Sequence, residues 1–252
     1  VKSYNLLGFS FREYLNLMTH NDFPSYTLDE ILRDHERIVR QILPKTGPLK
    51  YFRDYLHHGF YPFFLEERNF SENLLKTMNM MLEVDILLIK QIELKYLTKL
   101  KKLLYLLAIN GPVAPNVSQL AADISTSRAT VMNYLKYLAD ARLINMIYPK
   151  GETFPKKPAK IMMHNTNLMH VIYPSRFEEQ DILETFFQNT MWKDHKLAKG
   201  EKNTSFVVDG HIRFKISSGM IRKRNPELIY AHHGTEIGHG NEIPLWLFGF
   251  LY

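Results

Sequence analysis

The stretch that decides the fold runs from residue 116 to residue 148 and reads NVSQLAADISTSRATVMNYLKYLADARLINMIY. Apolar residues at helical spacing predict two helices, over 117–124 and 128–139, with Ser125-Thr126-Ser127 as the turn between them. Asn116 is suited to cap the first of these helices. A longer helix is predicted before them, over 95–109, and a strand after them, over 143–148. This order predicts a winged helix-turn-helix, to which we assign residues 93–155.

The second helix of the motif has a polar outer side. Its inner side carries Val131, Leu135 and Leu138, and small Ala121 on the first helix allows a close crossing. The polar residues left outside, with one lysine of the wing, are Arg128, Thr130, Asn133, Lys136 and Lys150. We expect Arg128 to reach a base edge or a phosphate, Thr130 and Asn133 to bond to bases or backbone, and the two lysines to contact phosphates. Folds of this kind also serve as protein-interaction modules, so a protein partner is the alternative to double-stranded DNA.

Positive charge is concentrated around this motif. Residues 90–160 contain twelve Lys and Arg against four Asp and Glu, a surplus of eight, whereas the whole chain has a net charge of +6. Neutralising phosphates and releasing their counterions drives nucleic-acid binding, so the cluster favours a polyanionic partner. The other interpretation is a solvated lysine surface without a partner.

The flanking segments are predicted to differ from each other. Residues 1–92 are expected to form a helical, lid-like segment, with helices over 11–17, 49–58 and 70–90 and a Thr27/Glu30 capping box ahead of another apolar stripe. Residues 156–252 are expected to form a small α/β domain. Its predicted elements are strands over 161–163, 205–208, 212–216 and 228–232, a helix over 182–193, a tight turn at Asp209-Gly210, and an apolar tail over 243–252 that docks on the domain. The predicted fold class is α+β and mainly helical: a helical bundle, a winged helix-turn-helix and an α/β domain.

Several kinds of chemistry lack their motifs. The sequence has no Cys, no Gly-x-x-x-x-Gly-Lys-Ser/Thr phosphate loop, no Gly-x-Ser-x-Gly and no His-Glu-x-x-His. The adjacent pairs His57-His58 and His232-His233 are poor chelates, because neighbouring side chains point to different sides of a helix or strand. We therefore expect surface or packing histidines and no cofactor in this chain. Without an apolar run of about 18 residues or a signal peptide, the chain is expected to be cytoplasmic and not bound to a membrane.

One further pattern points to a damaged catalytic site. Metal-dependent nucleases of the restriction-endonuclease type hold a divalent ion with a helix Glu, a strand Asp and a Glu-x-Lys on the next strand, because Mg²⁺ prefers oxygen ligands. Glu184 is the candidate helix acid. The strand positions carry Ser205 and Lys215 instead of acids, with Ser217 instead of the lysine. The pattern indicates a remnant without activity, and a nuclease centred on Glu184 is the alternative function.

Several motifs together resemble a known family. They are residues 8–15 (GFSFREYL), residues 51–56 (YFRDYL) with 59–66 (GFYPFFLE), residues 82–86 (LEVDI), residues 165–168 (NTNL), residues 184–187 (ETFF) and the tail from Gly238 to Tyr252. The chain resembles, over nearly its whole length, the part of prokaryotic AAA+-superfamily ATPases of the Bacteroides type that follows the P-loop module.

The resemblance implies a helical segment, a winged helix and a restriction-endonuclease-like domain in a bacterial ATPase. ATP and Mg²⁺ would bind in the missing P-loop module, which is itself a candidate partner. A chain beginning at Val1 is then expected to be a piece of a longer protein. Family members often have an acidic residue near the position of Ser205 and a Phe-Glu-(Ile/Val)-Gly-Gly-Lys stretch where this chain has Phe214-Lys215-Ile216-Ser217-Ser218-Gly219. The loss of both acids implies binding without cleavage.

Overall fold

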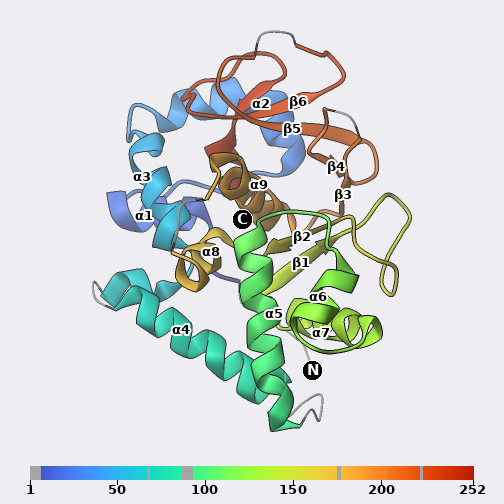
Figure 1. Ribbon diagram of the computed structural model, residues 1–252. Helices are drawn as coiled ribbons and strands as arrows, with labels where there is room; N and C mark the ends of the chain where they lie inside the picture. The colour runs from blue at the N-terminus through green and yellow to red at the C-terminus, as the bar shows by residue number, and fades with distance from the viewer. Residues whose placement is uncertain (1–6, 67–68, 87–92, 175–176, 202, 222–223) are drawn as a thin grey trace, which may run out of the picture.

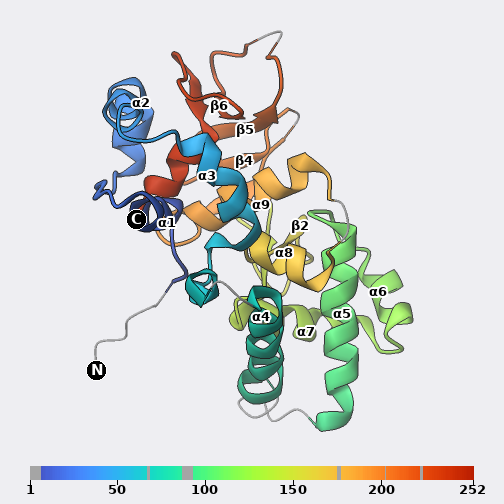
Figure 2. The same ribbon diagram turned by 90° about the vertical axis from the view of Figure 1, so that its left-hand side faces the viewer.

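The computed structural model is a mixed α+β fold, about half helical, with two small sheets. It describes the chain except for residues 1–6, 67–68, 87–92, 175–176, 202 and 222–223. In both views of the ribbon, α2 and strands β4 to β6 lie at one end and α4 to α7 at the other, with α8 and α9 between them (Figures 1 and 2). None of the described helices is long and apolar enough to cross a membrane.

The first segment is helical, as predicted. It contains α1 (Phe11–Thr19), α2 (Leu28–Ile42), α3 (Pro48–Asp54), the π-helix η1 (Tyr55–Gly59) and the 3-10 helix η2 (Pro62–Glu66). The Thr27/Glu30 capping box at the start of α2 is confirmed, and Ser10 with Glu13 forms a second one at α1. The helix predicted over 49–58 is α-helical only to Asp54 and continues as the π-helix.

The middle of the chain contains the predicted helices in the predicted order. They are α4 (Phe70–Met80) with the π-helix η3 (Met81–Ile86), the 3-10 turn η4 (Leu94–Tyr96), α5 (Leu97–Asn110), α6 (Val117–Asp123) and α7 (Arg128–Asp140). Residues 87–90, the end of the helix predicted over 70–90, lie outside the described residues. Strand β1 (Ile144–Ile147) pairs antiparallel with β2 (Lys160–Met163), and a single bridge joins Val113 to Ile161 at the edge of β2.

The last segment combines two helices with a five-stranded sheet. The helices are α8 (Thr166–Ile172) and α9 (Glu179–Met191); the strands are β3 (Leu197–Lys199), β4 (Phe206–Val208), β5 (Ile212–Ser218), β6 (Ile229–His233) and β7 (Glu242–Pro244), in that spatial order. β3 to β5 pair antiparallel, and β5 to β7 pair parallel. The turn at Asp209-Gly210 is confirmed: both residues have positive φ, which suits Gly and is tolerated by Asp. The sequence patterns missed α8, β3 and β7.

Two hydrophobic clusters hold these elements together. One joins α1, α2 and α3 to α9, the sheet and the 3-10 helix η5 (Leu245–Phe250); the other joins α4 to α5, α6, α7, α8, β1 and β2. The apolar tail therefore docks as predicted, and every residue of η5 is buried. The first four helices do not pack together as one bundle, since α1 and α2 contact η5 whereas α4 contacts α8. Strand β2 lies beyond residue 155 but pairs with β1, so the boundary predicted there passes through one sheet.

Candidate nucleic-acid interface

Local hydrogen bonds fix the start of α7. The Ser127 hydroxyl accepts from the Thr130 backbone N–H at 3.1 Å, which satisfies one of the free donors of the first turn. Thr126 N–H donates to the Ala121 carbonyl at 2.9 Å, and Ser125 adopts a positive φ of 52°, so the chain reverses within three residues. Val131 and Leu135 on α7 are buried against this turn and α6. Hydrogen bonds between residues close in the sequence thus fix the turn between α6 and α7.

The outer side of α7 is polar and open. α7 packs against α6 and β1, and Arg128, Ala129 and Asn133 on its other side are exposed. Thr130 is half-buried, and its hydroxyl is hydrogen-bonded to that of Ser127 at 2.9 Å. Lys136 is half-buried and forms an ion pair with Asp140 at 2.5 Å. Of the four predicted residues on this helix, Arg128 and Asn133 are therefore the ones most available to a ligand.

Two lysines of α5 are bound to the turn of the motif. Lys102 Nζ donates to the Asp123 carbonyl at 2.5 Å, and Lys99 Nζ donates to the Ser125 carbonyl at 2.6 Å. The Asp123 carbonyl belongs to the last turn of α6 and the Ser125 carbonyl lies just after it, where the helix dipole favours a cation. The two ammonium groups therefore hold α6 and the turn at a fixed position relative to α5.

Several other basic side chains of residues 90–160 also have partners within the chain. Ion pairs join Lys95 to Glu93, Lys101 to Glu83, Lys156 to Glu152 and Lys160 to Glu184. Lys90 lies outside the described residues, and the part of the chain that the structure describes offers no hydrogen-bond or ion-pair partner to Arg128 or Lys157. The charge surplus therefore overstates the free positive charge, and Arg128 is the cation that α7 leaves open.

The loop between β1 and β2 is attached to the second sheet. Lys199 N–H donates to the Tyr148 carbonyl at 2.9 Å, and Lys150 Nζ donates to the Gly210 carbonyl at 2.9 Å. Lys150 is exposed, but its ammonium faces the β4–β5 turn. The structure thus places this predicted site residue beside the second sheet, apart from the other four.

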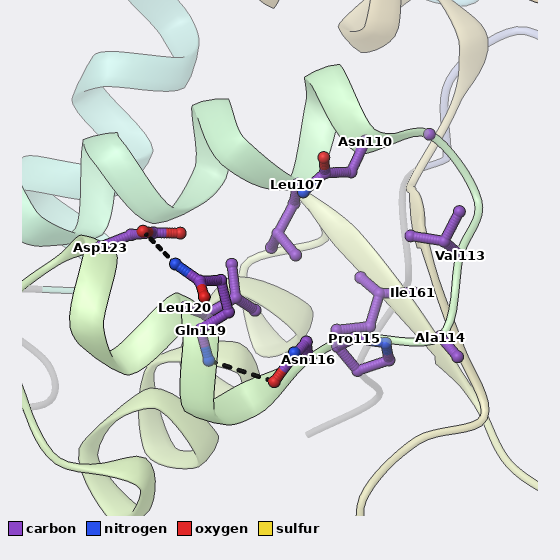
Figure 3. Close-up of a pocket in the computed structure, with 11 residues that line it drawn as sticks. Leu107, Asn110, Val113, Ala114, Pro115, Asn116, Gln119, Leu120, Asp123 and Ile161 are labelled. Carbon is purple, nitrogen blue, oxygen red and sulfur yellow. Dashed lines mark hydrogen bonds between the residues drawn. The ribbon is translucent and has the colours of Figure 1, made fainter.

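A small hollow lies on the other side of α6. It has a volume of about 280 Å³ and lies between α5, α6 and β2. Figure 3 shows Leu107, Leu120 and Ile161 around it, with the Gln119 amide turned to Asp123, to which it donates at 2.8 Å. Apolar walls and a paired carboxylate give this hollow no reactive group.

The proposed remnant site contains the buried carboxylate of Glu184, and both of its oxygens are bonded to other side chains. Glu184 is 8% exposed; Lys160 Nζ lies 2.5 Å from its Oε2, and Ser205 Oγ and Gln180 Nε2 each donate to its Oε1 at 3.0 Å. Burial by itself raises the pKa of Glu184, but the Lys160 ammonium and these hydrogen bonds outweigh it and lower the pKa below its ordinary value. The carboxylate is thus ionised and neutralised by a lysine.

The structure brings Glu184 and Ser205 together but leaves Lys215 out. Phe214 and Ile216 of β5 are buried in the cluster that contains α9, and strand alternation turns Lys215 and Ser217 to the other face. Among the described side chains, those that hydrogen-bond to Glu184 are Lys160, Gln180 and Ser205, and none of them is an acid. Across the described ranges, no group of three or more His, Cys, Asp or Glu side chains could hold a metal ion.

The histidine pairs contribute to a groove that sequence reasoning missed. His57, His58, His170 and His233 line a hollow of about 1360 Å³ together with Arg53, Asp54, Glu178 and Glu179. The His57 and His170 rings stack with centroids 4.6 Å apart. Burial, followed by the neighbouring His57, lowers the pKa of His170 to about 4, and burial also lowers the pKa of His58 and His233. The imidazoles of His58, His170 and His233 are therefore held in the neutral form.

Comparison with known proteins gives one match. A family model described as "Domain of unknown function (DUF8612)" matches residues 49–179, just over half of the chain. The matched segment includes all of α5, α6, α7, β1 and β2 and ends at the first residue of α9. No curated protein and no solved structure matches.

Proposed function

We propose that this chain, which belongs to the family of the domain of unknown function DUF8612, binds double-stranded DNA through the outer side of α7. The proposal rests on the geometry of the chain itself. The observation that carries this proposal is the exposed pair Arg128 and Asn133, about 1.4 turns apart on a helix that is buried on another side against α6 and β1. The proposal treats α5, α6, α7, β1 and β2 as a winged helix-turn-helix, with the loop between β1 and β2 as the wing.

Each side chain has a role that its surroundings allow. Arg128 lies in the first turn of α7, the part of a recognition helix that meets base edges, and its guanidinium can bind guanine or phosphate in a bidentate manner. Asn133 can bind adenine through its amide or donate to a phosphate. Lys136 reaches a phosphate only by leaving Asp140, which costs little because exposed ion pairs contribute about 0–1 kcal/mol. Thr130 stabilises the start of the helix through its bond to Ser127 and has no assigned contact with DNA.

We propose in addition that this DNA-binding region serves an AAA+-type ATPase, whose P-loop module would bind ATP and Mg²⁺ and act as a protein partner. The motif resemblance supports this context, and the present sequence has no phosphate loop of its own. The coding sequence upstream of Val1 tests the idea. A Gly-x-x-x-x-Gly-Lys-Ser/Thr stretch there is the expected result, and its absence would contradict the proposal.

The test of DNA binding is fluorescence anisotropy with a labelled duplex at about 50 mM and about 200 mM salt, because counterion release makes such affinity fall steeply with salt. The double variant Arg128→Ala with Lys136→Ala is expected to weaken binding by about tenfold or more. The slope of log affinity against log salt concentration is expected to decrease by the equivalent of about two phosphate contacts. The matched control is Arg40→Ala with Lys76→Ala, which removes the same two charges from exposed positions on α2 and α4. Equal effects of the two double variants, or no binding at the lower salt, would overturn the proposal.

Two further measurements would identify other functions. Mg²⁺-dependent nicking of plasmid that disappears in Glu184→Gln would identify a nuclease, but a carboxylate already bound to Lys160, Gln180 and Ser205 gives reason to expect none. A partner protein that binds the chain through α7 in the absence of any DNA affinity would identify a protein-interaction module.

A further inference from the structure

The wing separates two hollows of different character. On the side of α7, Lys136, Tyr148, Phe154 and His195 line a hollow between that helix, the wing and the end of α9. On the other side, a larger groove of about 1170 Å³ lies between the wing and strands β3 to β5. In Figure 1 the loop between β1 and β2 accordingly lies between α7 and the part of the second sheet formed by β3 and β4.

The larger groove, here called the hairpin groove, is lined by several basic side chains. Lys150 comes from the wing, Lys199 from the end of β3, and Arg213 and His211 from the start of β5 and the turn before it. Two acids, Glu201 and Glu227, share the lining. Gly200 is buried against the Thr204 backbone and the Gly210 carbonyl accepts from Lys150, so side chains form the surface that a ligand would meet.

The cations of the groove are available at little cost. Lys199 is exposed, and the described residues provide no hydrogen-bond or ion-pair partner for its ammonium. Arg213 pairs with Glu227 at 3.2 Å, but the two side chains are 54% and 71% exposed, so the pair exchanges readily with another anion. Lys150 has two N–H donors left after its bond to Gly210.

We propose that the hairpin groove binds the phosphodiester backbone of the duplex that α7 binds, on the far side of the wing. The inference rests on the proposed function, and it adds a second contact surface contributed by the C-terminal sheet. A wing bonded to that sheet at Tyr148 and Lys150 holds the groove at a fixed position relative to β1 and thus to α7. Lys199 and Arg213 contact phosphates, and Glu201 repels them.

The test compares a variant that is expected to weaken DNA binding with one that is expected to strengthen it. Lys199→Ala with Arg213→Ala is expected to weaken binding to a duplex of about two helical turns by roughly three- to tenfold, and to flatten its salt dependence by about two contacts. Glu201→Gln is expected to strengthen binding by about two- to threefold, since it removes a like charge. Arg40→Ala with Lys76→Ala, and Glu72→Gln on α4, are the matched controls at exposed positions far from the groove. Circular dichroism and thermal melts confirm that each variant is folded.

The length of the duplex separates the two contact surfaces. With a duplex of about one helical turn, centred on α7, the Lys199 and Arg213 variant is expected to bind like the unchanged protein, whereas the Arg128 and Lys136 variant stays weak. If the unchanged protein binds no DNA, the proposed function fails and this inference fails with it. If Arg128 matters while the Lys199, Arg213 and Glu201 variants match their controls on the longer duplex, the hairpin groove alone is excluded.

Discussion

The outer side of α7 and the surroundings of Glu184 are both candidate sites, but their polar groups differ in exposure and in whether they have partners within the chain. On α7, Arg128 and Asn133 are exposed, and no described residue pairs with the Arg128 guanidinium. Around Glu184, a carboxylate, an ammonium, an amide and a hydroxyl are packed together and satisfy one another. The Arg128 guanidinium is therefore available to a ligand, whereas the Glu184 carboxylate is committed to contacts within the fold.

The difference also explains why a nuclease-like pattern need not give a nuclease. Lys160 Nζ lies against Glu184 at the distance of a close ion pair, so a positive charge from the chain itself neutralises the acid. Because Lys160 belongs to β2 and Glu184 to α9, the ion pair joins the first sheet to this helix.

The largest predicted effect follows from breaking this pair. Lys160→Met leaves the Glu184 carboxylate buried without its counter-charge, so the free energy of unfolding is expected to fall by about 3–5 kcal/mol. Urea denaturation followed by circular dichroism measures the change. The same loss is not expected for Lys76→Met, whose partner Glu72 is exposed.

The double variant Lys160→Met with Glu184→Met sharpens the result. It removes both charges and fills the space with apolar atoms, so it is expected to recover most of the stability lost in the single variant. Recovery of DNA affinity together with stability would show that the pair acts only on the fold. A single variant as stable as the unchanged protein would refute the description of Glu184 as a carboxylate dependent on Lys160.

A second effect concerns pH and a buried histidine between β1 and α9. His164 is 4% exposed, its ring nitrogen is hydrogen-bonded to Asn145, and the Asn145 amide donates to Gln188 at 2.7 Å. Burial, together with the nearby charge of Arg142, lowers the pKa of His164 to about 4. The native state therefore keeps this ring neutral at pH values where the unfolded chain protonates it.

The sign of the pH dependence follows from this lowered pKa. The unfolded state binds a proton below about pH 6.5 and the native state only near pH 4, so the free energy of unfolding falls as the pH drops through this window, by up to about 3 kcal/mol for His164. Above pH 6.5 this contribution is complete, and below pH 4 it changes no further. Urea denaturation at several pH values measures the slope, and NMR titration of the imidazole measures the pKa. A His164 signal that titrates near pH 6.5 would contradict the burial of this ring.

Sequence patterns predicted local structure well where the cause is local. The caps at Thr27 and Asn116, the apolar stripes of α5 to α7 and the turn at Asp209-Gly210 each depend on residues a few positions apart. The contact between Glu184 and Ser205 was also anticipated, because the nuclease-like pattern relates the helix acid to the start of the next strands. Arg128 and Asn133 were found because helical periodicity separates the outer side of a helix from its inner side.

What the patterns missed depends on distant partners. The π-helix η1 ends at Gly59 because the Asn167 amide accepts from the Phe60 N–H and donates to the Tyr55 carbonyl, a contact between residues more than a hundred positions apart. The bond from Lys150 to the Gly210 carbonyl, which spans 60 positions, was not predicted either. The charge count treated lysines as free for the same reason: no local pattern shows that Lys99 and Lys102 face the carbonyls of the turn.

A third, smaller effect separates lysines that position α7 from residues that contact DNA. Lys99→Met with Lys102→Met removes two cations from the end of α6, each contributing about 0.3–1 kcal/mol, so DNA affinity is expected to fall by about threefold through a looser turn. Since neither ammonium contacts a phosphate in this proposal, the salt dependence is expected to stay unchanged. Arg at both positions should restore affinity. A flatter salt dependence would instead place these lysines at the interface.

The smallest predicted effect tests how far along α7 the DNA extends. Asp140→Asn releases Lys136 from an ion pair that is partly exposed, so the gain in affinity is expected to be only about two- to threefold, within the range of surface pairs. The free lysine adds one phosphate contact, and the salt dependence should steepen by about one. Anisotropy titrations at the two salt concentrations measure both quantities, with Glu72→Gln beside Lys76 as the matched control. If affinity and salt dependence both match the control, the duplex contacts α7 only near Arg128 and Asn133, and the second half of the helix lies outside the interface.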